Sequence, residues 1–165
     1  MLKIEHLKKH HDRKSFDCGS KKLNDFLHKY ARQHAEREIS RTFVLTEGTN
    51  PRKILGYYTL TVCEVIPSDI PDPRLKRYPH PMPAAKLARL AVCSNNQGNG
   101  IGEKLLLNAM ERSVAISENA GLIGLFVDAK SDGVSGYYKR YGFISTENDH
   151  LVLFLPMVTI RQAFD

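Results

Sequence analysis

The sequence has no run of 18 apolar residues, only three cysteines and no early apolar leader, and each absence excludes a class of protein. Without such an apolar run a transmembrane helix is excluded, so we expect no membrane partner. Charge interrupts the N-terminus at Lys3 and Glu5, which argues against a signal peptide. Cys18, Cys63 and Cys93 are odd in number and far apart, which favours neither a disulfide framework nor zinc. We therefore expect a cytoplasmic protein without a metal.

What is present is typical of a globular domain. The chain has 165 residues, of which 42% are hydrophobic and 25% charged, and this length fits one domain with one core. We expect a single domain over residues 1–165. The three histidines near the N-terminus are interpreted as a solvated turn rather than a metal cluster; they are His6, His10 and His11.

Hydrophobic periodicity predicts a mixed α/β sheet with helices around it. Apolar spacing predicts a helix from Ser20, its N-cap, to about Arg37. Its apolar stripe is Leu23, Phe26, Leu27, Tyr30, Ala31, His34 and Ala35. Strands are expected at 2–6, 41–46, 53–65, 86–92, 121–128 and 151–155, and further helices at 102–118 and through Tyr138. The proline-rich stretch from Pro67 to Pro83 is expected to be a loop.

The most informative stretch runs from Gln97 to Gly102, between a predicted strand and a predicted helix. Backbone N–H groups at a helix N-terminus favour phosphate oxygens, and glycines let the chain bend with positive φ. The stretch lacks the Gly-Lys-Ser/Thr ending of a Walker loop, and its G-x-G-x-G pattern departs from the dinucleotide fingerprint.

Two motifs together resemble the GNAT superfamily of acetyl-CoA-dependent N-acetyltransferases. Gln97, Gly100 and Gly102 match its Arg/Gln-x-x-Gly-x-Gly/Ala signature. Tyr137 to Phe143 matches its aromatic-Tyr-x-Lys/Arg-x-Gly-Phe segment. The resemblance covers roughly Asp17 to Leu155 and implies the mixed GNAT sheet, acetyl-CoA as the acetyl donor, and an acyltransferase.

The resemblance also assigns roles to residues of this chain. It implies that the backbone of Leu90, Ala91 and Val92 pairs with the pantetheine arm of the coenzyme. The pyrophosphate would bind at Gln97, Gly98, Asn99, Gly100, Ile101 and Gly102, with a further donor from the Gln97 side chain. Ser131 stands where many members have a pantetheine-binding Asn. Tyr138 matches the tyrosine that donates a proton to the departing sulfur, since a phenol of pKa about 10 is protonated at neutral pH.

No residue from Ala85 to Cys93 is a carboxylate or a histidine, although many family members place a general base on that strand. A lysine amine has a pKa of about 10.4 and needs such a base, whereas an α-amine near 7.7–8.0 is already partly neutral. From Pro73 to Gly102 the sequence has no acidic residue and five basic ones, a pattern that favours a polyanionic partner. Aminoacyl-tRNA meets both demands.

The chain further resembles the GNAT toxins of bacterial type II toxin–antitoxin modules. The matching segments include Phe16 to Gly19, Gly56 to Leu60 and Leu87 to Val92. This likeness implies acetylation of charged tRNA, a block of translation, a cognate DNA-binding antitoxin and a homodimer. Residues expected to contact tRNA are Arg89 first, then Lys86, Arg74, Arg77 and Arg32.

Two alternatives stay open at this point. The first alternative acceptor is a protein N-terminus, a lysine or a small amine, although a basic surface disfavours a cationic polyamine. The second alternative is a non-catalytic acyl-CoA-binding module, against which the presence of Tyr138 argues.

Overall fold

The structure is a computed structural model, and it describes residues 1–66 and 69–164. The strands are β1 (Leu2–His6), β2 (Arg41–Glu47), β3 (Gly56–Val65), β4 (Met82–Val92), β5 (Gly124–Asp128), β6 (Ile144–Ser145) and β7 (Val152–Pro156). The α-helices are α1 (Lys21–Asp25), α2 (Ala31–Glu36), α3 (Ile101–Asn119), α4 (Asp132–Lys139) and α5 (Met157–Phe164). Short helical turns of other kinds are η1 (Phe26–Tyr30), η3 (Pro73–Leu75) and η4 (Ser94–Asn96).

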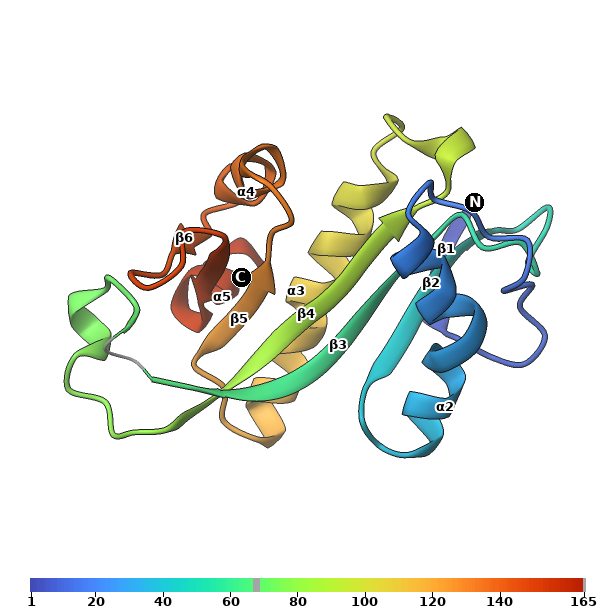
Figure 1. Cartoon of the computed structure of the whole chain (residues 1–165). Coiled ribbons are helices and arrows are strands. Elements are labelled where there is room, and N and C mark those ends of the chain that lie inside the picture. The colour runs from blue at the N-terminus through green and yellow to red at the C-terminus, as the bar shows by residue number, and fades with distance from the viewer. Residues whose placement is uncertain (67–68, 165) are drawn as a thin grey trace. The chain divides into compact units, whose positions relative to one another are not determined.

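The strands form a mixed seven-stranded sheet in the order β1-β2-β3-β4-β5-β7-β6, which confirms the predicted fold class (Figure 1). The chain divides into two compact units. The first unit is Met1–Thr61 with Ala88–Ala109, and the second unit is Val62–Leu87 with Met110–Asp165. Strands β3 and β4 and helix α3 each begin in one unit and continue in the other. The single domain expected over residues 1–165 stays a prediction.

In the first unit, β2 pairs antiparallel with β1 on one side and β3 on the other, so that Val44 lies opposite Glu5 and Tyr57. The helical segment that precedes β2 packs its apolar face on these strands (Figure 1). Burial of each large side chain there contributes about 1.5–3 kcal/mol. The core residues are Phe16, Phe26, Leu27, Ala31, Val44, Ile54, Tyr57, Ala91 and Cys93.

The helix predicted from Ser20 to Arg37 is present, but a wide turn interrupts it. The Ser20 hydroxyl accepts the N–H of Leu23, as expected of an N-cap. At η1 the helix takes π-type bonds, and the N–H of Ala31 reaches the carbonyl of Phe26, five residues back. The extra residue in that turn rotates Tyr30 outward, and the side chain is 48% exposed. The prediction that Tyr30 belongs to the buried stripe was therefore wrong.

In the second unit, β4 pairs in parallel with β5 over three residues, from Ala85 opposite Leu125 to Leu87 opposite Val127. Strand β7 pairs antiparallel with β5 and with the short β6. Helix α5 packs against β5 and β7. One core cluster of this unit is Ile70, Leu75, Ala84, Phe126 and Phe154.

Several predicted boundaries shift in the structure. Strand β4 begins at Met82, so Pro83 belongs to a strand and not to the proline-rich loop, and η3 lies within that loop. Pro67, the predicted start of the loop, lies outside the described residues. Strand β5 begins at Gly124 rather than at residue 121. Neither β6 nor α5 was predicted, because two residues are too short for a periodic signal and the α5 stripe follows β7 without a break.

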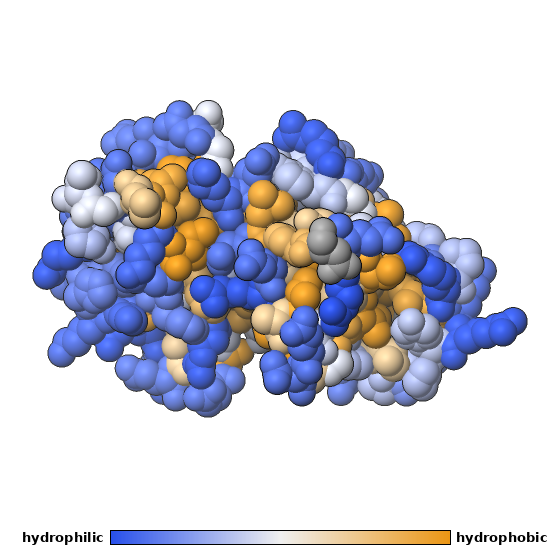
Figure 2. Space-filling view, turned by 180° about the vertical axis from the view of Figure 1, so that it is seen from behind, coloured by the Kyte–Doolittle hydropathy of each residue, from blue (hydrophilic) through white to orange (hydrophobic). Residues whose placement is uncertain are grey.

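The predicted buried stripe of α3 is largely confirmed, since Leu106, Ala109, Met110 and Ser113 are buried. On the face of the molecule shown in Figure 2, hydrophobic residues form patches between hydrophilic ones. Among the described residues, no helix combines the length and the apolar character needed to cross a bilayer.

Candidate active site

The glycine loop lies in the first unit, between η4 and the N-terminus of α3. Gly98 and Gly100 have φ of 83° and 79°, the left-handed region that a side chain disfavours. A Cβ at either position would meet no atom within 4 Å, so backbone conformation, and not crowding, requires glycine there. In the described part of the chain, no N–H from Gln97 to Gly102 donates to another residue. The loop thus offers a row of donors at the positive end of a 19-residue helix.

Gln97 braces this loop. Its side-chain nitrogen donates to the carbonyl of Val92 at 3.1 Å and to that of Cys18 at 3.3 Å. Both amide hydrogens are therefore used inside the protein. The side chain that was expected to donate to a pyrophosphate instead holds the loop to the end of β4 and to the segment before α1.

Asp17 fixes that segment. Its carboxylate accepts the N–H of Gly19 and the side-chain amide of Asn24, each at 2.9 Å. The backbone N–H of Gly19 is the largest cause of the lowered pKa of Asp17. The Asp17 carbonyl in turn accepts the N–H of Ser94 at 2.9 Å. Through these bonds the Phe16–Gly19 segment anchors the turn that follows β4 and leads into the glycine loop.

The predicted pantetheine strand, Leu90 to Val92, forms the end of β4; Ala91 is buried, and Leu90 and Val92 are partly exposed. A Cβ at Gly56 would come within 2.9 Å of Leu105 on α3 and 3.1 Å of the Ala91 carbonyl oxygen. Glycine at this point of β3 therefore lets both β4 and the start of α3 pack closely. The N–H of Cys93 then donates to the Leu55 carbonyl at 2.8 Å and fixes the end of the strand.

Arg89 lies on the same strand, half-buried, with its guanidinium 3.7 Å from the centre of the Phe26 ring. Burial lowers the pKa of this guanidinium, which an arginine tolerates without losing its charge. Beside it is a hollow of about 530 Å³, which we call the Arg89 cleft. Its lining residues are Lys21, Lys22, Asp25, Phe26, Tyr30 and Arg89. The cleft combines cations with aromatic faces, a combination that suits nucleotides.

In the second unit, Tyr138 lies on the buried face of α4 and is 5% exposed. Its ring packs edge-on against Tyr137 and Phe143, each at 5.4 Å between centroids. Burial, and then the neighbouring Tyr137, raise the pKa of the Tyr138 phenol. The phenol therefore keeps its proton at neutral pH and can serve as a proton donor, not as a base.

Two serines, one at the N-cap of α4 and one within the helix, lie close in sequence to Tyr138. The Ser131 hydroxyl accepts the N–H of Val134 at 3.3 Å and so caps α4, a structural use that the alignment with a pantetheine-binding Asn did not suggest. Ser135, one turn before Tyr138, is buried, and its hydroxyl has no partner among the described residues. Sequence reasoning missed Ser135; its i,i+3 spacing from Tyr138 was the available signal.

The second unit also contains a hollow of about 400 Å³ with an acidic lining, which we call the acidic hollow. Its charged residues are Glu64, Asp69, Lys86, Asp128 and Asp149. The Lys86 ammonium pairs with the Asp128 carboxylate at 2.8 Å. Strand β4 itself contains no carboxylate or histidine, in agreement with the sequence.

The structure distinguishes the five cations expected to contact tRNA. Arg74 forms a bidentate pair with Asp72, with a shortest distance of 2.7 Å. Arg32 lies 3.7 Å from Glu36. With Lys86 paired as well, three of the five have acidic partners. Arg77 is exposed, and Arg89 packs on an aromatic ring, so these two are the better candidates.

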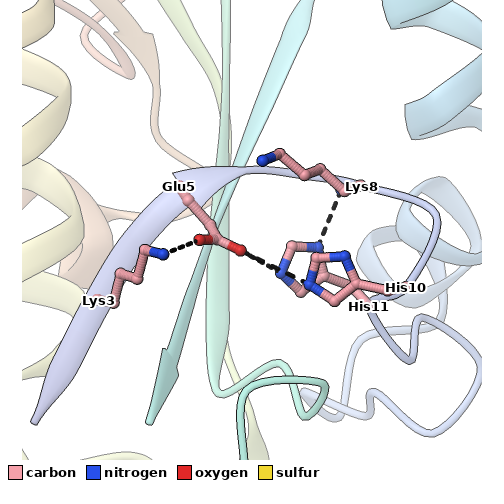
Figure 3. Close-up of polar contacts among 5 residues, drawn as sticks. All are labelled: Lys3, Glu5, Lys8, His10 and His11. Carbon is pink, nitrogen blue, oxygen red and sulfur yellow. Dashed lines mark hydrogen bonds and ion pairs between the residues drawn. The ribbon is translucent and has the colours of Figure 1, made fainter. Parts of the chain in front are cut away.

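Of the three N-terminal histidines, only His11 departs from the predicted solvated turn, because it is buried at 3% exposure, whereas His6 and His10 are exposed. Figure 3 shows His11 with its partners Glu5 and Lys8. Its Nδ1 accepts the N–H of Lys8 at 2.9 Å, so Nε2 carries the proton and donates to Glu5 at 2.9 Å. Glu5, His10 and His11 bring their donor atoms within 4.8 Å of one another. Both nitrogens of His11 are nevertheless used in hydrogen bonds.

These features can be compared with known proteins. The chain belongs to the GNAT acetyltransferases, since the family model described as an acetyltransferase (GNAT) domain matches residues 15–161. It is 33% identical over 147 residues to a "tRNA-acetylating toxin" of Mycobacterium tuberculosis, covering 89% of this chain and 87% of that protein.

Two solved structures are similar over nearly the whole chain. One is AtaT in complex with acetyl-methionyl-tRNAfMet, with a TM-score of 0.92, 32% identity and full coverage of both chains. The other is a tyrosine-to-phenylalanine variant of AtaT bound to the C-terminus of the antitoxin AtaR and acetyl-CoA, with a TM-score of 0.83 and 32% identity. That match covers 99% of this chain and 98% of the other.

Proposed function

We propose that this acetyltransferase moves the acetyl group of acetyl-CoA to the α-amino group of aminoacyl-tRNA and thereby blocks translation. The named activity of the mycobacterial relative and the tRNA bound to AtaT support this acceptor. We also propose that a cognate antitoxin neutralises the protein, which is supported by the AtaR segment bound to AtaT.

The residues fit the proposed coenzyme. The glycine loop offers unused N–H donors to a diphosphate, and the open space around Gly98 and Gly100 leaves room for its oxygens. We propose that Gln97 to Gly102 hold the diphosphate, that Leu90 to Val92 hold the pantetheine arm, and that Ser131 lies near it. Gln97 contributes through its backbone and as the brace of the loop, because its side-chain hydrogens are already used.

Tyr138 is proposed as the general acid. Acetyl-CoA supplies the acetyl group as a thioester, whose sulfur leaves as a thiolate when the amine attacks the carbonyl carbon. The raised pKa of Tyr138 keeps a proton on the phenol, available for that sulfur. The amine loses its proton to solvent, and the phenolate then recovers one, so the enzyme returns to its starting state.

The observation that carries the choice of acceptor is the composition of β4. No residue from Met82 to Val92 is a carboxylate or a histidine, while Arg89 of the same strand presents a cation against the ring of Phe26 in η1. An acceptor must therefore arrive largely uncharged and carry negative charge elsewhere. An α-amine on an esterified tRNA meets this condition far better than a lysine of pKa about 10.4.

The test is acetyl transfer from labelled acetyl-CoA to charged tRNA, with the same tRNA after deacylation as the matched control. We expect label on charged tRNA alone, removed when the ester bond is hydrolysed in mild alkali. Label on bulk protein or on free amines instead would assign the enzyme to the alternative acceptors. Binding of acetyl-CoA without transfer to any acceptor would indicate a regulatory binding module.

Two further properties are proposed on the family likeness. We propose a cytoplasmic location, where charged tRNA is present, and a homodimer. Light scattering coupled to size exclusion measures the mass directly, and a mass of one chain at micromolar concentration would contradict the dimer.

A further inference from the structure

The first unit contains a second hollow, of about 560 Å³, outside every residue assigned above to the coenzyme or to tRNA. It lies between the loop that follows β1 and the β2–β3 hairpin. We call it the basic hollow. Its lining residues are Lys9, His11, Asp12, Arg13, Lys14, Ser15, Phe16, Asn50, Arg52, Lys53, Ile54 and Cys93.

The charges of this hollow are strongly one-sided. Five basic side chains face one carboxylate, Asp12, which gives a net charge of +4 with His11 neutral, out of +6 for the whole chain. Within residues 1–66 and 69–164, none of the five basic side chains lies within ion-pair distance of an acid. Clustered cations repel one another and oppose folding unless an anion compensates them.

The backbone that carries these cations is fixed. The N–H of Asp12 donates to the Arg52 carbonyl at 2.8 Å, and Asp12 and Lys53 form a parallel bridge. The Asp12 carboxylate accepts the N–H of Ser15 at 3.2 Å, so it serves the loop. The guanidinium of Arg13 donates to the His28 carbonyl at 3.2 Å. Buried His11, held by Lys8 and Glu5, fixes the start of the same loop (Figure 3).

A preformed hollow with uncompensated cations is suited to several phosphates held at once. One phosphate would leave most of the charge unneutralised, whereas a phosphodiester backbone places a negative charge at each nucleotide. Lysines act there as point charges, and arginines as bidentate donors. The hollow shares no residue with Leu90–Val92 or with the glycine loop, so the coenzyme diphosphate has its own donors elsewhere.

We propose that the basic hollow binds the sugar–phosphate backbone of tRNA, away from the acceptor end. This inference rests on the proposed function for the identity of the nucleic acid. It adds Lys9, Arg13, Lys14, Arg52 and Lys53 to the tRNA surface. These residues position the acceptor through phosphate contacts that are independent of sequence.

The test uses the double variant Arg52→Gln, Lys53→Gln in the full-length protein. Both side chains are exposed, and the backbone bonds of the two loops stay in place. The matched control is Lys29→Gln, Arg37→Gln, which removes the same charge from exposed positions outside the hollow. Affinity for deacylated tRNA is measured by fluorescence anisotropy over a range of salt concentrations. Calorimetry measures acetyl-CoA binding, and a thermal melt measures stability.

We expect the salt slope of tRNA binding to fall by about two in the hollow variant, since each lost phosphate contact lowers it by about one. The control should keep the wild-type slope within measurement error. Acetyl-CoA affinity should not change, and thermal stability should stay equal or rise, because like-charge repulsion is relieved.

Three outcomes overturn the inference. An unchanged salt slope would show that the hollow does not contact tRNA. A parallel loss of acetyl-CoA affinity would assign the hollow to a phosphate of the coenzyme. An equal fall of the salt slope in the control variant would show that the effect comes from the net charge of the protein and not from the hollow. Failure of the proposed function gives a different result. Wild-type protein would then leave charged tRNA unacetylated, whatever the salt slope of tRNA binding is.

Discussion

The basic hollow of the first unit and the acidic hollow of the second handle charge in opposite ways. In the acidic hollow the one cation, Lys86, pairs with Asp128 at 2.8 Å. In the basic hollow none of the five cations forms an ion pair within the described residues, although the charge of Arg52 acts on Asp12. The stretch that sequence charge singled out, Pro73 to Gly102, contains Lys86 and Arg74, and both are compensated in space. Unpaired charge, and not local composition, therefore marks the surface for a polyanion.

The same contrast extends to the chemistry. The first unit contains the groups suited to phosphate, namely the glycine loop and the basic hollow. The second unit contains the proposed proton donor, Tyr138, inside a cluster of aromatic rings. Substitutions in the first unit should therefore change binding, and substitutions of Tyr138 should change turnover.

The largest expected effect is that of Tyr138→Phe. Removing the hydroxyl should lower kcat by about 10²–10⁴-fold, the usual contribution of a general acid, and leave acetyl-CoA affinity within twofold. Single-turnover acetylation of charged tRNA measures the first quantity and calorimetry the second. The control is Tyr141→Phe, which removes a phenol from the same motif and should keep near-normal turnover. An active Tyr138→Phe would refute the acid assignment.

Gly100→Ala should have the next largest effect, and it should lower the affinity for acetyl-CoA rather than turnover. At φ of 79° a Cβ costs roughly 1–2 kcal/mol, which corresponds to about 5- to 30-fold in acetyl-CoA affinity if the loop must keep this shape. Gly121→Ala is the matched control, because Gly121 has equal space and no positive φ. Equal affinities for the two variants would mean that the loop conformation is not needed for the coenzyme.

Arg89→Gln should weaken the use of tRNA more than the binding of acetyl-CoA. The loss of one phosphate contact should lower the salt slope of tRNA binding by about one. Arg89→Lys keeps the charge and should restore the slope, though not the packing on Phe26. If both variants lose acetyl-CoA affinity to the same extent as tRNA, Arg89 supports the fold of β4 and not the acceptor.

Lys86→Gln tests whether a paired cation of the acidic hollow contributes less to tRNA binding than the cations of the basic hollow. Because Asp128 already compensates Lys86, tRNA affinity should change less than twofold, and stability by no more than about 1 kcal/mol for an exposed pair. Binding and melting curves test both expectations. A tenfold loss of tRNA affinity would show that Lys86 leaves Asp128 to contact tRNA.

The last prediction concerns His11 and the dependence of stability on pH, and it leaves the site unchanged. Burial, and then the neighbouring His10, lower the pKa of His11 in the folded protein from its ordinary value of 6.5. The unfolded chain therefore binds this proton more readily, and the free energy of unfolding should fall as pH drops below 6.5, by at most about 1.4 kcal/mol per unit. In His11→Asn, whose side-chain oxygen can still accept the Lys8 N–H, this decline should be absent between pH 7 and 5. Denaturant titrations measure it, and identical slopes would contradict the assignment.

Local motifs in the sequence predicted the parts of the site that depend on neighbouring residues. The positive φ of Gly98 and Gly100, the Ser20 cap and the helix through Tyr138 all follow from short segments. The basic hollow did not, because its cations come from residues 9–14 and 52–53, and the bridge between Asp12 and Lys53 that joins those segments has no local signal in the sequence. The basic runs Lys8-Lys9 and Arg52-Lys53 were the available signal. The compensation of Lys86 by Asp128 was equally invisible without the fold, whereas Asp72 lies only two residues before Arg74.

The wide turn at η1 has a consequence for how the Arg89 cleft can evolve. That turn shifts the phase of the helix, and the shift alone turns Tyr30 from the interior to the wall of the cleft. Deleting one residue between 26 and 30 would return the helix to regular phase and withdraw the ring. A change of length, with every other side chain unaltered, is then enough to remodel the surface that an acceptor meets.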